Sequence, residues 1–234
     1  MPRSARASAA GYCDHAIDRG NARAEVFHKP EDYAAFLRVV AEAGLRTPMR
    51  VVAYVLVPNH FHLVFWPSGD GDLSRWMRWL LTAHVRRYRR HHGGNGHVRH
   101  GRFKAFRIEE SQHMMPVIRY VERNALRAGL VDRAEQWPWS SLRGNDLPVL
   151  DPGPVPRGPD WRGHVNAPMT HGEVGAIRLS MRRDRPHGSE TWTVVAAVRL
   201  GLESSLRPRG RQPSDMPETG HPEGELPSLP GRQS

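Results

Sequence analysis

Two histidines, His60 and His62, lie two residues apart in an apolar segment that spans residues 55–65. Side chains alternate between the faces of a β-strand, so both imidazoles would project from one face while Phe61 and Leu63 project from the other. Neighbouring imidazoles on a rigid strand are suitable ligands for a metal ion. A His-x-His pair on its own is more often two polar residues on a solvated face, so the rest of the chain must decide between the two interpretations.

A second candidate group consists of Tyr120 and Asn124, within a predicted helix over residues 114–128. Residues four apart are neighbours on one face of a helix. The amide oxygen of Asn124 could complete a metal site with the two histidines, and the Tyr120 hydroxyl could attack a phosphate bound there. Taken alone, the pair also fits a packed aromatic residue and a polar residue near the end of a helix.

The composition of the chain favours a polyanionic partner. The 34 Lys and Arg residues against 24 Asp and Glu give a formal net charge of +10, and arginine suits bidentate contact with phosphate. The single cysteine, Cys13, excludes an intramolecular disulfide and a cysteine-based zinc cluster. No apolar run has the length of a membrane span and the N-terminus lacks the apolar core of a signal peptide, so we expect a cytoplasmic protein with no membrane partner.

The elements that would position these residues follow from their hydrophobic periodicity. Strands are expected over residues 11–19, 50–57, 60–66 and 98–108, and helices over residues 31–43, 73–88 and 114–128. This order predicts an α+β, ferredoxin-like sandwich, in which an antiparallel sheet carries helices on one face.

The chain is expected to divide into four parts. Residues 1–10 would be a flexible N-terminus and residues 11–145 the main domain. Residues 146–205 would be a linker and a small helical accessory region, with short helices over residues 174–183 and 190–200. Residues 206–234 are rich in Pro, Gly, Ser and charged residues, which favours a disordered tail.

Several motifs in a fixed order resemble one known family. Residues 56–63, LVPNHFHL, resemble the "MPNHxHL" signature of the single-tyrosine HUH transposases. Residues 120–131, YVERNALRAGLV, resemble that family's "YIxxNPVRAGLV" helix, and residues 15–20, 101–104 and 139–141 agree in order. The chain is most similar to the branch of the REP-associated tyrosine transposases, with residues 11–145 as the catalytic domain.

This resemblance implies a specific chemistry. His60, His62 and Asn124 would hold a divalent ion, Mg²⁺ or Mn²⁺, and Tyr120 would attack single-stranded DNA, often beside a palindromic hairpin, to give a 5′-phosphotyrosine link and a free 3′-hydroxyl. The protein would then act as a metal-dependent nuclease and strand transferase in DNA transposition and recombination. Basic residues near this site are the expected DNA contacts: Arg86, Arg87, Arg89, Arg90, Arg102, Lys104, Arg107 and Arg127.

Two other functions fit the same residues. A domesticated protein could bind hairpin DNA without cutting it, or a metal-dependent hydrolase could use water as the nucleophile, with Tyr120 only structural. The resemblance implies a bacterial cytoplasmic protein that associates with the nucleoid when it is bound to DNA. The sequence leaves open whether the protein is a monomer or a homodimer.

Overall fold

A four-stranded sheet forms the centre of the protein, of which a computed structural model describes residues 10–144 and 148–207. The strands are β1 (Cys13–Arg19), β2 (Met49–Val57), β3 (His60–Pro67) and β4 (Lys104–Ile108). All pairs are antiparallel, in the order β2-β3-β1-β4. This order is the ferredoxin-like arrangement, so the predicted α+β fold with an antiparallel sheet is confirmed.

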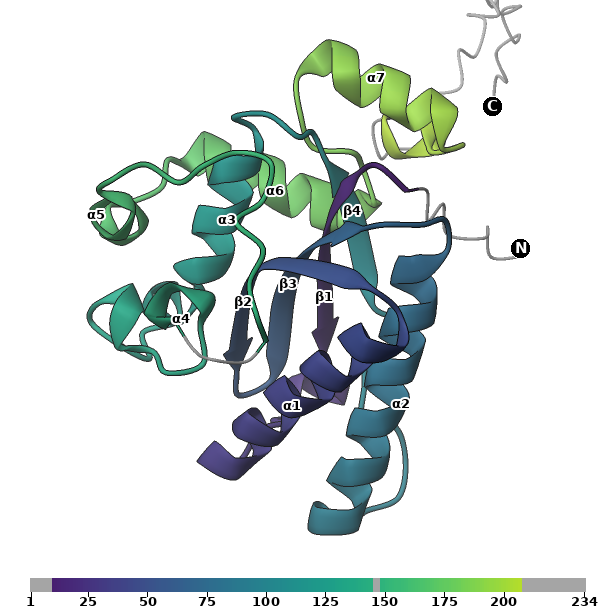
Figure 1. The fold of residues 1–234 in the computed structure, drawn as a ribbon, viewed down its shortest axis with the longest axis vertical. Coiled ribbons are helices and arrows are strands. Elements are labelled where there is room, and N and C mark those ends of the chain that lie inside the picture. Colours follow the sequence, from purple (N-terminus) through teal and green to yellow (C-terminus); the bar gives the residue numbers. More distant parts are fainter. Residues whose placement is uncertain (1–9, 145–147, 208–234) are drawn as a thin grey trace, which may run out of the picture.

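Two helices cover one face of the sheet, α1 (Pro30–Arg46) and α2 (Asp72–His92), and they pack against each other (Figure 1). The core on this side contains Phe61, Leu63 and Phe65 from β3 together with Phe36 of α1 and Trp76 of α2, all fully buried. The period-two alternation of β3 therefore places its aromatic and aliphatic residues on this face, as predicted.

A helix also covers the opposite face, where the prediction had none. This helix is α3 (Met114–Glu122), and its apolar residues form a second core with Val55 and Val57 of β2. Tyr54 and Leu56 of the same strand are buried in the first core. Because β2 is apolar on both faces, it has to be covered on both. The sheet therefore carries helices on two faces rather than one.

Two predicted elements differ in extent from the observed ones. The strand expected over residues 98–108 begins only at Lys104, because Gly101 has a φ of +70° and interrupts the extended backbone. The helix expected over residues 114–128 is divided at Arg123 into α3 and a single turn, α4 (Asn124–Arg127).

Residues 148–207 contain three α-helices: α5 (Trp161–Asn166), α6 (His171–Arg183) and α7 (Glu190–Arg199). The last two agree with the helices expected over residues 174–183 and 190–200, whereas α5 was not predicted.

Short 3₁₀ turns occupy Asn21–Arg23, Ala134–Gln136, Ser141–Arg143 and Glu203–Ser205. The expected flexible N-terminus and disordered tail lie almost wholly outside the described residues. No helix in the described ranges is long and apolar enough to cross a membrane.

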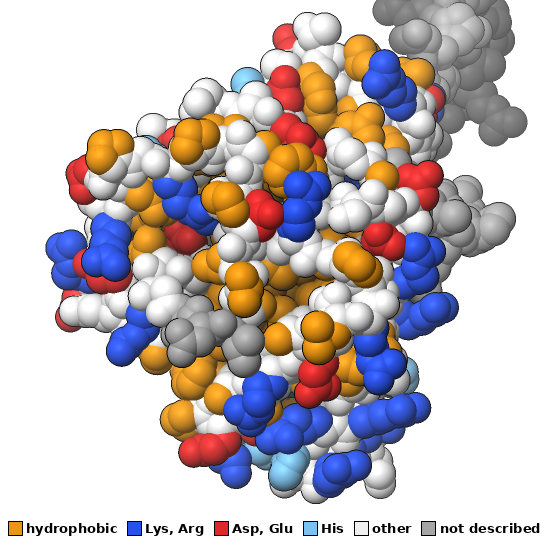
Figure 2. All heavy atoms as spheres, in the orientation of Figure 1, with side chains coloured by type: hydrophobic (Ala, Val, Ile, Leu, Met, Phe, Trp, Pro, Cys, Tyr) orange, Lys and Arg blue, Asp and Glu red, His pale blue; other side chains and the backbone are white. Residues whose placement is uncertain are grey.

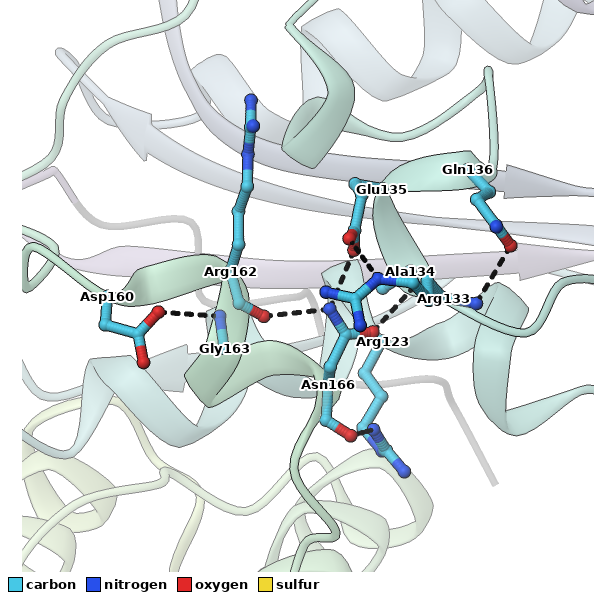
Figure 3. Close-up of polar contacts among 9 residues, drawn as sticks. All are labelled: Arg123, Arg133, Ala134, Glu135, Gln136, Asp160, Arg162, Gly163 and Asn166. Carbon is cyan, nitrogen blue, oxygen red and sulfur yellow. Dashed lines mark hydrogen bonds and ion pairs between the residues drawn. The ribbon is translucent and has the colours of Figure 1, made fainter.

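The Asn166 side chain links α5 to the turn that follows α4 (Figure 3). Its Oδ1 accepts a hydrogen bond from the backbone N–H of Ala134 at 2.9 Å, and its Nδ2 donates to Glu135 Oε2 at 2.7 Å and to the Arg162 carbonyl at 2.9 Å. Arg123, beside Asn124, donates to the backbone carbonyl oxygen of Asn166. These bonds connect the accessory region to the end of the α3–α4 segment.

We expect Asn166→Ala to lower the free energy of unfolding by about 1–3 kcal/mol, because it leaves partly buried donors and acceptors without partners. Urea denaturation would measure the change. Arg162→Ala is the matched control, since only the backbone carbonyl of Arg162 takes part and its side chain extends away from the network in Figure 3. A change as large in Arg162→Ala as in Asn166→Ala would contradict this account.

Candidate active site

His60 and His62 project together from the face of β3 opposite Phe61, as the strand pattern predicts. Their ring centroids lie 5.0 Å apart. His62 is fully buried and His60 is half-buried. The strand thus holds two imidazoles side by side at the edge of the second core.

Both histidines use Nδ1 for a hydrogen bond. The Nδ1 of His60 lies 2.6 Å from Asn59 Oδ1, and the Nδ1 of His62 lies 2.8 Å from His15 Nε2. Such bonds fix the orientation of a metal-binding imidazole and leave Nε2 for the ion. The Nε2 of His62 is buried and has no hydrogen-bond partner in the described part of the chain.

Tyr120 and Asn124 lie against the two histidines. The Tyr120 ring centroid is 5.8 Å from that of His62, with the rings nearly perpendicular, and the Arg127 guanidinium carbon is 4.6 Å from the Tyr120 ring centroid. Asn124 is fully buried, and its side-chain amide lies next to the His60 imidazole. Within the described ranges neither its Oδ1 nor its Nδ2 has a hydrogen bond of ordinary geometry. The structure therefore brings all four predicted site residues together.

The histidines are held in the neutral state. Burial, with the positive charges of Arg19 and Arg127, lowers the pKa of His60 to about 3, and the adjacent Asn124 amide acts in the opposite direction. Burial and the neighbouring His15 and His60 likewise keep the pKa of His62 well below its ordinary value. A neutral imidazole retains the lone pair that a metal requires.

The donor set fits a hard or borderline divalent ion. Two imidazole nitrogens and one amide oxygen, with no thiolate, suit Mn²⁺ or Mg²⁺, which complete their coordination with water and substrate oxygens. Such an ion would bind the polar side-chain atoms of His62 and Asn124 that lack a regular hydrogen bond in the described part of the chain. Among the described residues, no group of three or more His, Cys, Asp or Glu side chains is arranged to hold a metal. The site would therefore depend on the amide and on ligands from outside the chain.

A cavity of about 480 Å³ lies beside the two histidines. His60, His62 and Tyr120 form part of its lining. Its walls also carry six cationic side chains: Arg19, Arg102, Lys104, Arg127, Arg178 and Arg182. Within residues 10–144 and 148–207 none of the six forms an ion pair with a carboxylate. The cavity is therefore suited to an anionic substrate.

The expected DNA contacts fall into three groups. Arg102, Lys104 and Arg127 line the cavity. The cluster Arg86, Arg87, Arg89 and Arg90 lies at the end of α2, which packs on the other face of the sheet, and does not line the cavity. Figure 2 shows basic side chains over the lower part of the molecule, where α1 and α2 lie.

Arg107 is the exception among these residues. It is only 3% exposed and is ion-paired with the fully buried Asp14, its direct cross-strand partner in β1. A guanidinium enclosed in this way is not available to a DNA phosphate.

The residues of the site that were not assigned to it from the sequence include His15, Arg19, Arg178 and Arg182. His15 reaches His62 because β1 and β3 are adjacent and the two residues are diagonal neighbours in the pairing register. Arg19 is paired with His60 in the same register. Arg19 could have been assigned to the site from the sequence, because it lies in the strand expected over residues 11–19 and on the same face as His15. No local signal placed Arg178 or Arg182 near Tyr120.

Residues 11–124 match the family model described as "Transposase IS200 like". This segment, just under half of the chain, is similar to the IS200-like transposases. The match contains His60, His62, Tyr120 and Asn124, and it ends before Arg127 and the helices of the accessory region.

Two known proteins are also similar to this chain. The REP-associated tyrosine transposase of Escherichia coli (strain K12) is 26% identical over 119 residues, which are 50% of this chain and 66% of the relative, just under two thirds of its length. A solved REP-associated tyrosine transposase bound to a REP hairpin is 21% identical, with a TM-score of 0.51 over 61% of this chain and 84% of that one. The structural likeness shows a shared fold.

Proposed function

We propose that the protein is a transposase-like strand transferase that cleaves and rejoins single-stranded DNA near hairpins of the REP type. One observation carries the proposal: Tyr120 lies in the same cavity as two neutral histidines, and the cavity walls are lined by cations that have no carboxylate partner among the described residues. A phenol, a candidate metal site and a basic surface are the parts needed for phosphoryl transfer to tyrosine. The structural relative bound to a REP hairpin supports DNA as the substrate class.

The proposed step transfers a phosphoryl group from DNA to the protein. The Tyr120 oxygen attacks the phosphorus of a phosphodiester and loses its proton, and the bond between phosphorus and the 3′-oxygen of the preceding nucleotide breaks. The 3′-oxygen takes up a proton and leaves as a free hydroxyl, while the 5′-phosphate remains on Tyr120. Attack by a 3′-hydroxyl on the phosphotyrosine reverses the step and rejoins DNA.

His60, His62 and Asn124 would hold the divalent ion, which supplies charge stabilisation at the scissile phosphate. Asn59 and His15 would orient the two imidazoles through the hydrogen bonds to their Nδ1 atoms. Arg127, stacked on the Tyr120 ring, brings a fixed positive charge beside the phenol.

A hydrolase that uses water is less well supported by the cavity. Such an enzyme requires a base near the metal, most often a carboxylate or a further histidine. His100 lines the cavity as a further histidine, so Tyr120→Phe is needed to separate the two nucleophiles. Among the described residues lining the cavity, Asp18 is the only carboxylate, and it is ion-paired with Arg99 at 3.2 Å. Its carboxylate is thus already engaged with the protein.

The test is a covalent adduct on a denaturing gel. The full-length protein is incubated with hairpin DNA that carries a single-stranded tail, with Mn²⁺ or Mg²⁺, and with the label on either side of the cut. The label on the 3′ side should remain with the protein, and the label on the 5′ side should be released. We expect EDTA to reduce the adduct by about 100-fold or more, and added Mn²⁺ to restore it.

Two outcomes would contradict the proposal. DNA binding without any adduct in either metal would indicate a domesticated DNA-binding protein. An adduct that forms equally well in EDTA would exclude the metal function of His60, His62 and Asn124.

A further inference from the structure

Helix α6 of the accessory region forms one wall of the cavity that contains Tyr120. Arg178, Met181 and Arg182 of this helix line the cavity, together with His60 and His62 of β3. Arg178 and Arg182 are one turn apart, so their side chains share a face of the helix. Ile177 of the same helix is fully buried in the apolar cluster that includes Tyr120. The helix is therefore packed onto the site.

The start of α6 is held by the residue next to Tyr120. Arg119 is 5% exposed, and it donates hydrogen bonds to the carbonyl oxygens of Ala167 and Pro168 at 2.8 and 3.0 Å. Its guanidinium also lies 3.6 Å from Glu173, which forms a capping box with Thr170 at the start of the helix. The position of α6 is thus set by α3, the helix that carries Tyr120.

The segment after α6 is held by the edge strand of the sheet. His187 donates from its backbone N–H to the Arg107 carbonyl at 2.8 Å, and its own carbonyl accepts from the Glu109 N–H at 2.9 Å. His187 also forms a parallel bridge with Ile108 of β4. Because both ends are bonded to the transposase domain, α6 is a fixed wall of the cavity.

The two arginines of this wall have no carboxylate partner in the described part of the chain, and Glu173, near the start of the same helix, pairs with Arg119 instead. Both side chains are exposed to solvent at the cavity wall and so are accessible to an anion, and arginine binds phosphate oxygens in a bidentate manner. At about 480 Å³ the cavity has the size of a site for a small ligand. A cavity of this size admits about one or two nucleotides of a single strand and is too small for a duplex.

We propose that α6 is part of the DNA-binding site, and that Arg178 and Arg182 each contact a phosphate of the single strand that flanks the scissile position. The inference rests on the proposed function, and it extends the site beyond the segment 11–124 that matches the transposase family. The accessory region would then bind the DNA strand directly.

The test measures binding without cleavage. Tyr120→Phe protein in EDTA is titrated against a fluorescently labelled 20-nucleotide oligothymidylate at several salt concentrations, with and without the pair Arg178→Ala and Arg182→Ala. We expect the dissociation constant to rise about tenfold, and the slope of log affinity against log salt to fall by about 1.4, for two lost contacts with single-stranded DNA. The matched control pair, Arg162→Ala and Arg199→Ala, removes the same charge from exposed positions outside the cavity and should change affinity less than twofold.

Equal losses in the two pairs, or an unchanged salt slope in the Arg178 and Arg182 pair, would overturn this proposal. The result does not depend on whether the protein cleaves DNA. If the protein with Tyr120 intact forms no adduct, the proposed strand transfer fails, whereas the binding comparison still decides whether α6 contacts the strand.

Discussion

The variant Tyr120→Phe should form no covalent protein–DNA adduct, a loss of at least about 1,000-fold, while it binds DNA within about twofold of the unmodified protein. The substitution removes only the nucleophilic oxygen. The ring is 3% exposed and lies between His62 and the Arg127 guanidinium, and phenylalanine preserves both contacts. The adduct gel and an anisotropy titration on the same preparations would measure the two effects.

A matched control separates loss of the nucleophile from a general effect of removing a hydroxyl. Tyr88 lies on α2, on the other face of the sheet, and its hydroxyl is 3.0 Å from His28 Nε2. Tyr88→Phe should retain the adduct. Metal-dependent cleavage that survives in Tyr120→Phe would show that water is the nucleophile, and Tyr120 would then have only a structural function.

The geometry of the histidine pair could be predicted because it depends on local alternation. His60, Phe61 and His62 lie on one strand, so their faces follow from period two alone, and the structure agrees. The order of strands and helices was also sufficient for the ferredoxin-like sheet. In both cases the information lies within a few residues or in the order of elements along the chain.

Contacts that depend on strand register could not be predicted in the same way. The bond between His15 and His62 joins residues 47 apart, and it exists only because β1 pairs with β3 in one particular register. Asp14 and Arg107 are direct partners across β1 and β4, so Arg107, which was an expected DNA contact, is buried in an ion pair. A shift of one residue would have placed each on the other face.

The distribution of basic residues shows a similar limit. Local density of arginine selected residues 86–90, but the buried face of α2 is set by Leu73, Trp76 and Leu80, which turn this helix toward the first core, away from Tyr120. Arg178 and Arg182 reach the cavity from a separate part of the chain because Arg119 and His187 fix α6 there. Such a placement depends on tertiary packing, of which a single sequence carries no direct sign.

His84→Leu should make the protein less sensitive to acid. His84 lies on α2, 5% exposed, with its ring centroid 5.0 Å from Phe36 and 5.4 Å from Phe27. Its Nε2 has no hydrogen-bond partner among the described residues. Burial, with the positive charges of Arg99 and Arg87, keeps the pKa of His84 well below its ordinary value.

The sign of the pH effect follows from this lowered pKa. Above pH 6.5 the imidazole is neutral in both the folded and the unfolded chain, so the buried ring has no pH-dependent effect on stability. Below pH 6.5 only the unfolded chain takes up the proton, and the free energy of unfolding falls by about 1.4 kcal/mol per pH unit for this group. Leucine has no such proton. The stability of His84→Leu relative to the unmodified protein should therefore increase by about 2 kcal/mol between pH 7.5 and pH 5.

Urea denaturation of both proteins at pH 7.5, 6 and 5 would measure this change. The other buried histidines, His15 and His62 among them, titrate alike in the two proteins, so their effect cancels in the difference. His97→Leu alters an exposed imidazole and is the matched control, since its stability should follow that of the unmodified protein at every pH. Parallel profiles for His84→Leu and the unmodified protein would show that His84 becomes protonated within the folded protein, and that the first core admits a charge next to Phe27 and Phe36.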